Sequence, residues 1–469
     1  MLPLAVLGMS VVLTFVIPFR PALTDVYCIC FLGAFAALSW HVFVSRQAES
    51  LAMTIKGFFV VAAAPPALLL LGQTVLGARP HLAYPVSLRF HQWLGPYVEF
   101  TAYGVALGFI AAFVMGADHR RRSIAPAHDA LRHLCQPHSA LFWFFLIQSV
   151  LYSSFQFLSG EAVLLRGGYG LDESEHLLGI NAWNAMGTLT LILAAGFRDR
   201  REQGSLTFLW LAGAYLIVVN LLHGNRADII GLALVGVVMA ARRRIQIKNS
   251  VTIGVMAGAT ACVAIAVAAL RSRTGADDVT FRAVIMPGDF WYFPSVNDFF
   301  GSLPLTISYM QYDGGELWLG RSYYLCLTSL LPAAVNPWRI DESASRYLLE
   351  NYWQYNGGLY LPAEIWINFG VVGVFAAAPL LGRFLSWMER KLMRDPTFPR
   401  RAIVWGIIAG MPRWILYGSS TFSKQLFLIG LFWLAAMVIS VWLKRKIQLA
   451  TPPRRRHAPL APSSDSIAR

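Results

Sequence analysis

Long apolar runs separated by short polar stretches make up most of this chain. An α-helix rises about 1.5 Å per residue, so about 20 apolar residues cross the hydrocarbon core of a bilayer. The pattern predicts about twelve membrane helices, and therefore an all-α, polytopic integral membrane protein. The apolar runs are 2–19, 24–44, 57–77, 96–116, 140–159, 178–197, 206–223, 228–241, 250–270, 362–385, 402–418 and 425–443.

The basic residues are concentrated in every second connection between the apolar runs. Roughly 25 of the 39 Lys and Arg residues follow the even-numbered runs or lie in the C-terminal tail. Because cytoplasmic loops are enriched in Lys and Arg, this asymmetry places both termini in the cytoplasm of a multi-pass protein of the bacterial inner membrane. The first run lacks a basic start and a cleavage site, so we expect it to be retained.

Composition agrees with this picture. The chain is 56% hydrophobic and only 14% charged, with a mean hydropathy of +0.53. These values exclude a soluble globule of 469 residues. The net charge of +14 follows from the basic cytoplasmic connections, and we expect no nucleic-acid partner.

One connection is far longer than the others. Four parts are expected: helices in 1–270, a large extracytoplasmic loop in 271–361, helices in 362–443 and a disordered basic cytoplasmic tail in 444–469. Loops large enough to build a site are where function concentrates, so the site is expected in 271–361 and in the helix that follows it.

The long loop contains six arginines and no lysine, on a face where few cations are expected. The planar guanidinium fork matches phosphate oxygens, so this excess indicates an anionic partner. Aromatic residues lie between the arginines and have two interpretations: platforms for sugar rings, or the headgroup belt of a membrane protein. The arginines are Arg271, Arg273, Arg282, Arg321, Arg339 and Arg346.

Two stretches in this region have a helical pattern. The apolar run from Arg321 to Pro332 is too short to span a bilayer, so it predicts an interfacial or re-entrant helix. Pro362 suits the first turn of the next helix, which places Glu364 in that turn and Asn368 on the same face.

The glycines of this second stretch have their own expectation. Gly370 and Gly373 follow Asn368 closely, and they would let another helix approach. Glu364 has two interpretations: a first-turn charge that favours the helix start, or a member of a site.

These stretches resemble the Wzy-type polymerases of bacterial O-antigen and oligosaccharide repeat units. Ala333 departs from the arginine that commonly follows the proline, and Trp366 stands where tyrosine is usual. The residues that carry the resemblance are Gly320-Arg321-Ser322-Tyr323, the run to Pro332, Pro337, Glu364-Ile365-Trp366-Ile367-Asn368-Phe369-Gly370-Val371-Val372-Gly373, Gly382 and the upstream Gly224-Asn225-Arg226.

The resemblance implies a membrane glycosyltransferase that joins polyprenyl-pyrophosphate-linked oligosaccharides at the outer face of the inner membrane. We expect no cofactor, and no acidic ligand cluster argues for a metal. It implies a cationic clamp for the departing pyrophosphate and a base for the attacking hydroxyl. For the base we expect Glu364 first and His223 second. For substrate binding we expect Arg226 and Arg321 first, then Arg339, Arg271 and Arg273, together with Arg413 and Asn368.

For two of these arginines, a structural role is the alternative to substrate binding. Arg226 can be a charge at the helix mouth paired with Asp228. Arg413 interrupts the run 402–418, so either it needs a partner or a wet cavity, or the helix boundary is misplaced.

Other functions stay open. A lipid-linked oligosaccharide flippase or transporter would have as many helices, but more often two similar halves with short loops. An O-antigen ligase would share the lipid-linked donor. The expected partners are that lipid-linked oligosaccharide, the bilayer and a possible chain-length regulator protein. The sequence contains no Gly-Lys-Ser/Thr phosphate loop and no His-Glu-x-x-His metal motif.

Overall fold

A computed structural model gives the architecture. It describes residues 1–16, 23–44, 85–117, 298–312, 315–328, 359–394 and 410–450, with a few isolated positions between them.

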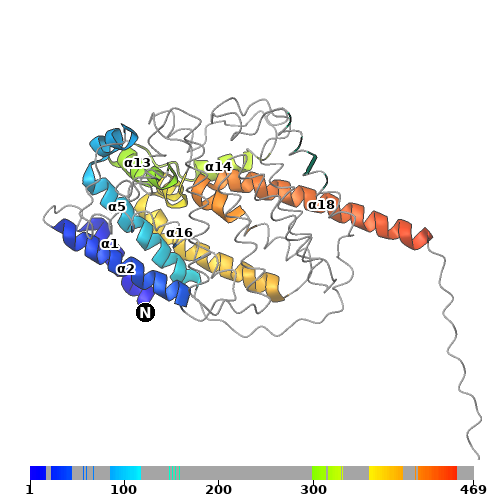
Figure 1. The fold of residues 1–469 in the computed structure, drawn as a ribbon, viewed down its shortest axis with the longest axis horizontal. Coiled ribbons are helices and arrows are strands. Elements are labelled where there is room, and N and C mark those ends of the chain that lie inside the picture. The colour runs from blue at the N-terminus through cyan, green and yellow to red at the C-terminus, as the bar shows by residue number, and fades with distance from the viewer. Residues whose placement is uncertain are drawn as a thin grey trace, which may run out of the picture.

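Most of the described residues are helical, and they contain no strand beyond an isolated bridge between Leu359 and Tyr417. Four of the described helices are long and apolar enough to cross a membrane, through 25–42, 100–117, 361–388 and 422–443. The helices are α1 (Leu2–Phe15), α2 (Thr24–Val44), α5 (Pro85–Ala117), α13 (Asp298–Tyr312), α14 (Arg321–Thr328), α16 (Leu361–Arg394) and α18 (Ser419–Ala450), as Figure 1 shows.

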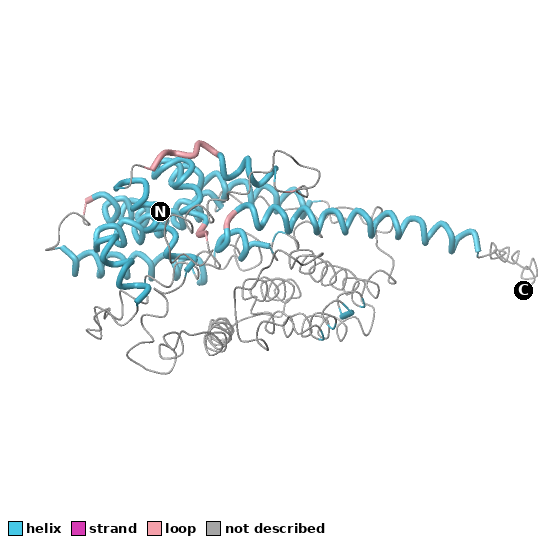
Figure 2. Tube along the Cα trace, turned by 90° about the horizontal axis from the view of Figure 1, so that it is seen from above, coloured by secondary structure: helices cyan, strands magenta, loops and turns pink. Residues whose placement is uncertain are grey.

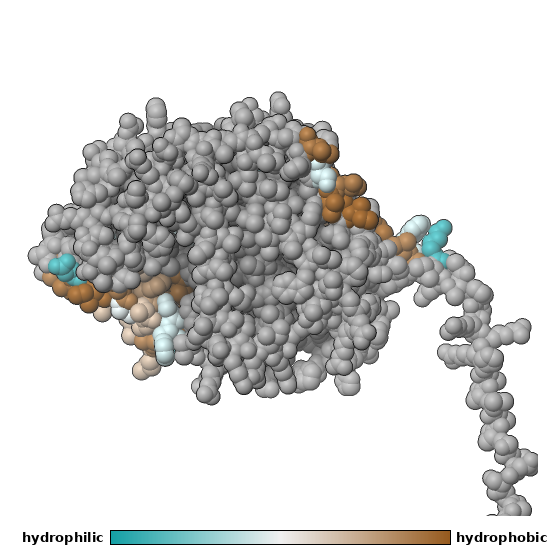
Figure 3. Space-filling view, in the orientation of Figure 1, coloured by the Kyte–Doolittle hydropathy of each residue, from teal (hydrophilic) through white to brown (hydrophobic). Residues whose placement is uncertain are grey.

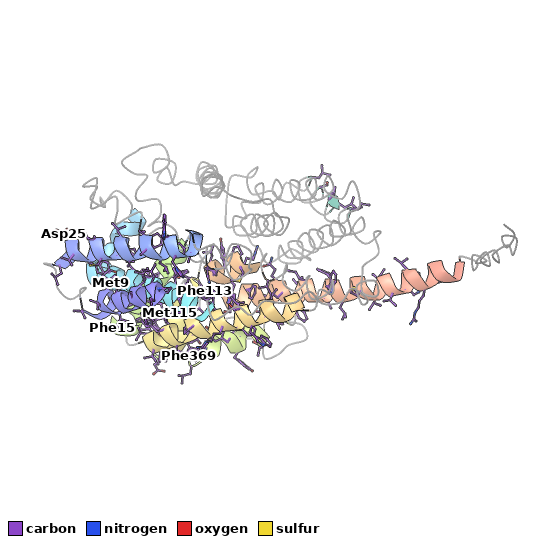
Figure 4. All side chains as sticks on the ribbon, turned by 90° about the horizontal axis from the view of Figure 1, so that it is seen from below. Met9, Phe15, Asp25, Phe113, Met115 and Phe369 are labelled. Atoms are coloured by element: carbon purple, nitrogen blue, oxygen red, sulfur yellow. The ribbon has the colours of Figure 1, made fainter. Side chains whose placement is uncertain are left out.

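Helix α5 is the centre of the described bundle. It packs against α1, α13 and α16 (Figure 1), and Phe113 on it points into the interior (Figure 4) and is fully buried. A Cβ atom on Gly116 would overlap the backbone of Pro379, and one on Gly382 would overlap the carbonyl of Phe113. Small residues therefore allow the α5 and α16 backbones to touch, as in other membrane helix pairs.

Helix α18 is the least buried of the four apolar spans. Only 6% of its apolar span is buried, and brown apolar residues cover the part that extends from the body (Figure 3). Its C-terminal end lies far from the N-terminus (Figure 2). In a membrane protein such a face is covered by lipid.

The described helices bear out the helical membrane architecture. Their bounds differ in detail, because helices continue into polar residues that a hydropathy window excludes; α5 begins at Pro85, eleven residues before the predicted start. Helix α1 is 14 residues long, shorter than a span. The count of twelve helices and most of the predicted large loop lie outside the described residues.

Helix α13 lies within the predicted loop and was not predicted. Its sequence contains Pro304 and too few apolar residues for a span. Leu303 and Ile307 are nevertheless fully buried, in a helix that packs against α5 and α16. Tertiary packing stabilises this short helix, where its own sequence gives a weak signal.

Candidate functional site

The first turn of α16 is fixed by contacts on both sides. The backbone N–H of Leu359 donates to the carbonyl of Leu416 at 2.9 Å, and the N–H of Tyr360 donates to Ser302 Oγ of α13 at 2.8 Å. The carbonyl of Tyr360 then accepts the N–H of Glu364 at 3.1 Å. The position of Glu364 is therefore set by three separate segments of the chain.

Glu364 lies in the first turn, as predicted, and its carboxylate is buried with 2% exposure. Its Oε1 atom accepts the Ser322 hydroxyl at 3.1 Å. Its Oε2 atom accepts the Ser419 backbone N–H at 2.8 Å and the Ser419 hydroxyl at 2.7 Å. Three donors from two other helices thus meet one carboxylate.

Asn368 lies one turn further along the same face of α16 and is fully buried. Its Oδ1 atom accepts the backbone N–H groups of Gly320 at 3.1 Å and Ser322 at 3.3 Å. Its Nδ2 atom donates to Ser322 Oγ at 2.7 Å and to the Glu364 carbonyl at 2.6 Å. We call Glu364, Asn368, Ser322 and Ser419 the Glu364 cluster.

The cluster supplies hydrogen-bond acceptors for the first backbone N–H groups of two other helices. The first N–H groups of any helix lack partners within that helix. Asn368 accepts two of them at the start of α14, and Glu364 accepts one at the start of α18. Side chains on one face of α16 therefore fix the positions at which both helices begin.

The hydrogen bonds of the cluster also have a fixed direction. Ser419 Oγ accepts Trp414 Nε1 at 3.1 Å, and Ser322 Oγ accepts Asn368 Nδ2 at 2.7 Å. Each hydroxyl then donates its own proton to Glu364. Both carboxylate oxygens of Glu364 therefore act as acceptors in this network.

Gly370 has a role different from the predicted one. Its φ of 66° and ψ of −167° break α16 into two helical parts, a conformation that suits glycine. The carbonyls of Ile367 and Asn368 then accept N–H groups of Trp318 and Leu319, each at 3.0 Å. Gly370 thus lets the segment before α14 pair with α16, where the sequence predicts an approaching helix.

Gly373 likewise makes no contact with another helix in the described residues. A Cβ atom on it would meet the side chain of Phe369, four residues earlier on α16.

Arg321 begins α14 at the edge of the cluster. Its side chain is exposed, and the guanidinium carbon lies 5.3 Å from the centre of the Trp318 ring, which is cation–π geometry. Tyr323 stacks on Phe369 with ring centres 6.1 Å apart. The exposed rim of the buried cluster is therefore cationic and aromatic.

The inner side of α14 also carries Leu325 and Cys326, both buried. Burial, with the nearby negative charge of Glu364 as second cause, raises the pKa of the Cys326 thiol to about 12, although a hydrogen bond with Ser423 and the charge of Lys424 act in the opposite direction. Cys326 is thus a neutral thiol, packed between α14 and α18.

The structure brings together three of the predicted site residues: Glu364 and Asn368 directly, with Arg321 at their edge. Arg413 lies in the helical residues 410–417 with 7% exposure, next to Trp414. The remaining predicted site residues are outside the described ranges: His223, Arg226, Arg271, Arg273 and Arg339.

Ser419 was missed by sequence reasoning. It follows Gly418, whose φ of 86° ends the helical residues 410–417 before α18 begins. A Gly-Ser-Ser step is a common helix-end and helix-start pattern, so the break itself was readable in the sequence. Nothing in the sequence pairs Ser419 with a residue 55 positions earlier.

Chemically, the cluster can hold three helix starts together and present Arg321 to an anion. Among the described residues, no group of three or more His, Cys, Asp or Glu side chains could hold a metal ion. Comparison with known protein families, with curated proteins and with solved structures finds no match for this chain.

Proposed function

We propose that the chain polymerises polyprenyl-pyrophosphate-linked oligosaccharide repeat units at the outer face of the bacterial inner membrane, in the synthesis of a surface polysaccharide. One observation supports this proposal above the others. The two stretches that carry the resemblance to such polymerases, around Arg321 and Glu364, are hydrogen-bonded to each other through Ser322 and Asn368. Stretches about 40 residues apart in sequence thus form one site.

In this proposal, the growing glycan leaves its lipid pyrophosphate and is joined to a sugar hydroxyl of the next lipid-linked unit. Arg321 is placed to stabilise the charge that develops on the leaving pyrophosphate, because it is exposed and oriented by Trp318. Arg226 is proposed as a second cation of the clamp. Cleavage of the bond between the glycan and the lipid pyrophosphate supplies the driving force, so the reaction needs no ATP.

Glu364 has two possible roles in this reaction. As the base, it would have to exchange the hydrogen bond from Ser322 or Ser419 for one from the sugar hydroxyl. As a positioning residue, it would keep these bonds and hold α14, and with it Arg321, against α16. The structure gives direct support to the positioning role, and the base role stays a prediction.

The test is a gel profile of surface polysaccharide from the producing bacterium. It compares wild type, a deletion, and the variants Arg226→Ala, Arg321→Ala and Glu364→Ala at matched membrane levels. Arg445→Ala is the control, because Arg445 is an exposed arginine near the far end of α18. We expect the deletion to leave glycan capped by a single repeat unit, and the Arg445→Ala profile to match wild type.

Other profiles would point to the alternative functions. If lipid-linked single units accumulate on the cytoplasmic face, the chain is a flippase. If long lipid-linked chains accumulate on the outer face, it is a ligase. Either profile would reject the polymerase proposal.

The two roles of Glu364 separate in the same assay. Ser419→Ala removes one hydrogen bond to the carboxylate but leaves the carboxylate itself. A base at Glu364 predicts that Glu364→Gln abolishes chain extension while Ser419→Ala retains most of it. A positioning role predicts that both variants shorten chains in proportion to their loss of stability.

A further inference from the structure

The two oxygens of the Glu364 carboxylate differ in their hydrogen bonds. Oε2 accepts two donors, both from Ser419: the backbone N–H at 2.8 Å and the hydroxyl at 2.7 Å. Among the described residues, Oε1 accepts only the Ser322 hydroxyl, at 3.1 Å. Since a carboxylate oxygen has about two acceptor positions, Oε2 is fully used and Oε1 has one position left.

The bond from Ser322 is also the longer of the two hydroxyl bonds to this carboxylate. Hydrogen bonds from a hydroxyl to a carboxylate are commonly about 2.5–2.7 Å long. The Ser419 bond lies at the end of this range, and the Ser322 bond lies outside it. Catalytic hydrogen bonds are often long before the substrate binds, and they shorten in the reacting complex. The contact between Ser322 and Oε1 has this geometry.

The Ser322 hydroxyl links two side chains of α16. Its oxygen accepts Asn368 Nδ2 at 2.7 Å, and it donates its own proton to Oε1 of Glu364. A hydroxyl oxygen has two lone pairs, and Asn368 occupies one of them. A further donor can therefore bind Ser322 Oγ without breaking either bond.

Ser419 has a similar pair of bonds, from Trp414 Nε1 at 3.1 Å and to Oε2. Two observations favour Ser322 over it. A proton added to Oε2 would weaken the acceptor of the Ser419 backbone N–H, whereas Oε1 accepts no backbone group. Ser322 also directly follows Arg321, the exposed arginine that is proposed to stabilise the leaving pyrophosphate.

We propose that Ser322 is a catalytic residue that relays the proton of the acceptor sugar hydroxyl to Oε1 of Glu364, while Ser419 keeps Oε2 occupied. This inference rests on the proposed function, with Glu364 as the base. The relay explains how a carboxylate with 2% exposure serves a substrate without touching it. Ser322 is buried too, so the sugar hydroxyl has to enter beside Arg321, at the exposed start of α14.

The step moves two protons and exchanges one bond for another. The sugar hydroxyl gives its proton to Ser322 Oγ, and Ser322 gives its own proton to Oε1 of Glu364. The sugar oxygen bonds to the anomeric carbon of the growing glycan, and the bond from that carbon to the lipid pyrophosphate breaks. The electron pair leaves with the pyrophosphate. The proton on Glu364 then returns through Ser322 to the released pyrophosphate, which restores the carboxylate.

Turnover by the full-length protein in phosphatidylcholine nanodiscs tests the relay. The substrate is the pool of lipid-linked repeat units extracted from the deletion strain. We expect Ser322→Ala to lower kcat about 100-fold with little change in KM. Ser322→Thr keeps a hydroxyl and should recover much of this loss. Ser419→Ala is the matched comparison, because it removes the other hydroxyl on the same carboxylate, and it should lower kcat far less than Ser322→Ala.

The solvent isotope effect separates a relay from a purely structural role. With two protons in transfer, the single-turnover rate falls along a curve as D₂O replaces H₂O, whereas one transferred proton gives a straight line. We expect a curve for wild type and for Ser419→Ala. A straight line for wild type would overturn the relay, as would wild-type kcat in Ser322→Ala.

Failure of the relay is distinguishable from failure of the polymerase proposal. If the wild-type protein does not extend the repeat units, both proposals are rejected. If it extends them and its isotope profile is a straight line, the polymerase proposal stands and the relay alone is rejected.

Discussion

Oε2 of Glu364 accepts both donors of Ser419, the backbone N–H at 2.8 Å and the hydroxyl at 2.7 Å. The two residues are 55 positions apart and begin two different helices. A carboxylate near a helix N-terminus is stabilised by the unpaired N–H groups and by the helix dipole. This pair therefore fixes where α18 starts relative to α16.

Replacing Glu364 by Gln will destabilise the protein although the shape is kept. The amide has one oxygen and one NH₂ group, whereas the carboxylate oxygens face only donors: the Ser322 hydroxyl and two groups of Ser419. A donor would meet a donor, and the unmade bond costs about 1–3 kcal/mol. Thermal unfolding of the detergent-solubilised protein should show a clearly lower midpoint for Glu364→Gln.

Ser39→Ala is the control for this measurement. The Ser39 hydroxyl bonds only to the Phe35 carbonyl of its own helix at 2.7 Å, so its loss should leave the midpoint near that of wild type. A midpoint for Glu364→Gln as high as that of Ser39→Ala would contradict the capping role of the carboxylate.

Asn368→Asp will destabilise more than Asn368→Ala. The Asn368 amide donates to Ser322 Oγ at 2.7 Å and to the Glu364 carbonyl at 2.6 Å. A carboxylate there would place a second buried negative charge against that carbonyl and near the Glu364 side chain, which is costlier than deleting the group. Unfolding midpoints of the two variants, measured side by side, decide the order; a lower midpoint for Asn368→Ala would refute this reading.

The sequence predicts the helices that carry this site, but not the contacts between them. Periodicity and apolar length are local properties, so the helix over 24–44 is predicted with the bounds that the structure gives. The shared face of Glu364 and Asn368 is local too, and it is confirmed because both side chains bond the Ser322 hydroxyl. The bonds to Ser322 and Ser419 depend on how distant helices pack, which no spacing along the chain encodes.

The kink in α16 shows the same limit. A glycine in an apolar helix is compatible with close packing or with a break, and the sequence cannot distinguish them. At Gly370 the outcome depends on the segment around Leu319, which offers N–H groups to the carbonyls that the break frees. The short apolar run after Arg321 was sufficient to predict α14, because its length and its start are local signals.

Alanine at Gly370 or Gly418 will be tolerated poorly. These glycines have φ values of 66° and 86°, where a Cβ atom costs about 1–2 kcal/mol. At Gly418 the new Cβ atom would also lie 3.0 Å from Leu359 Cδ2. Gly430→Ala is the matched control, since Gly430 is helical and has no atom within 4 Å of the new Cβ, so a better helix former should not lower stability there.

The measurement for these glycines is the unfolding midpoint together with the amount of protein in the membrane. We expect Gly370→Ala and Gly418→Ala to fall below wild type in both, and Gly430→Ala to equal or exceed it. If all three variants behave alike, the backbone conformations at positions 370 and 418 are not those described.

Cys326 will resist alkylation in the folded protein. Burial raises the pKa of its thiol to about 12, and the thiolate is the species that reacts. The neutral thiol is the form that folding favours, so its stabilising contribution is complete below the ordinary thiol pKa near 9 and declines as the pH rises toward 12. Maleimide labelling at neutral pH, followed by peptide mass spectrometry, should show little Cys326 adduct in the native protein and full adduct after unfolding in detergent.

Since the charge of Glu364 also raises the pKa of Cys326, Glu364→Gln should accelerate the labelling, and Ser39→Ala should not. Rapid labelling of native wild type would mean that α14 and α18 are not packed as described.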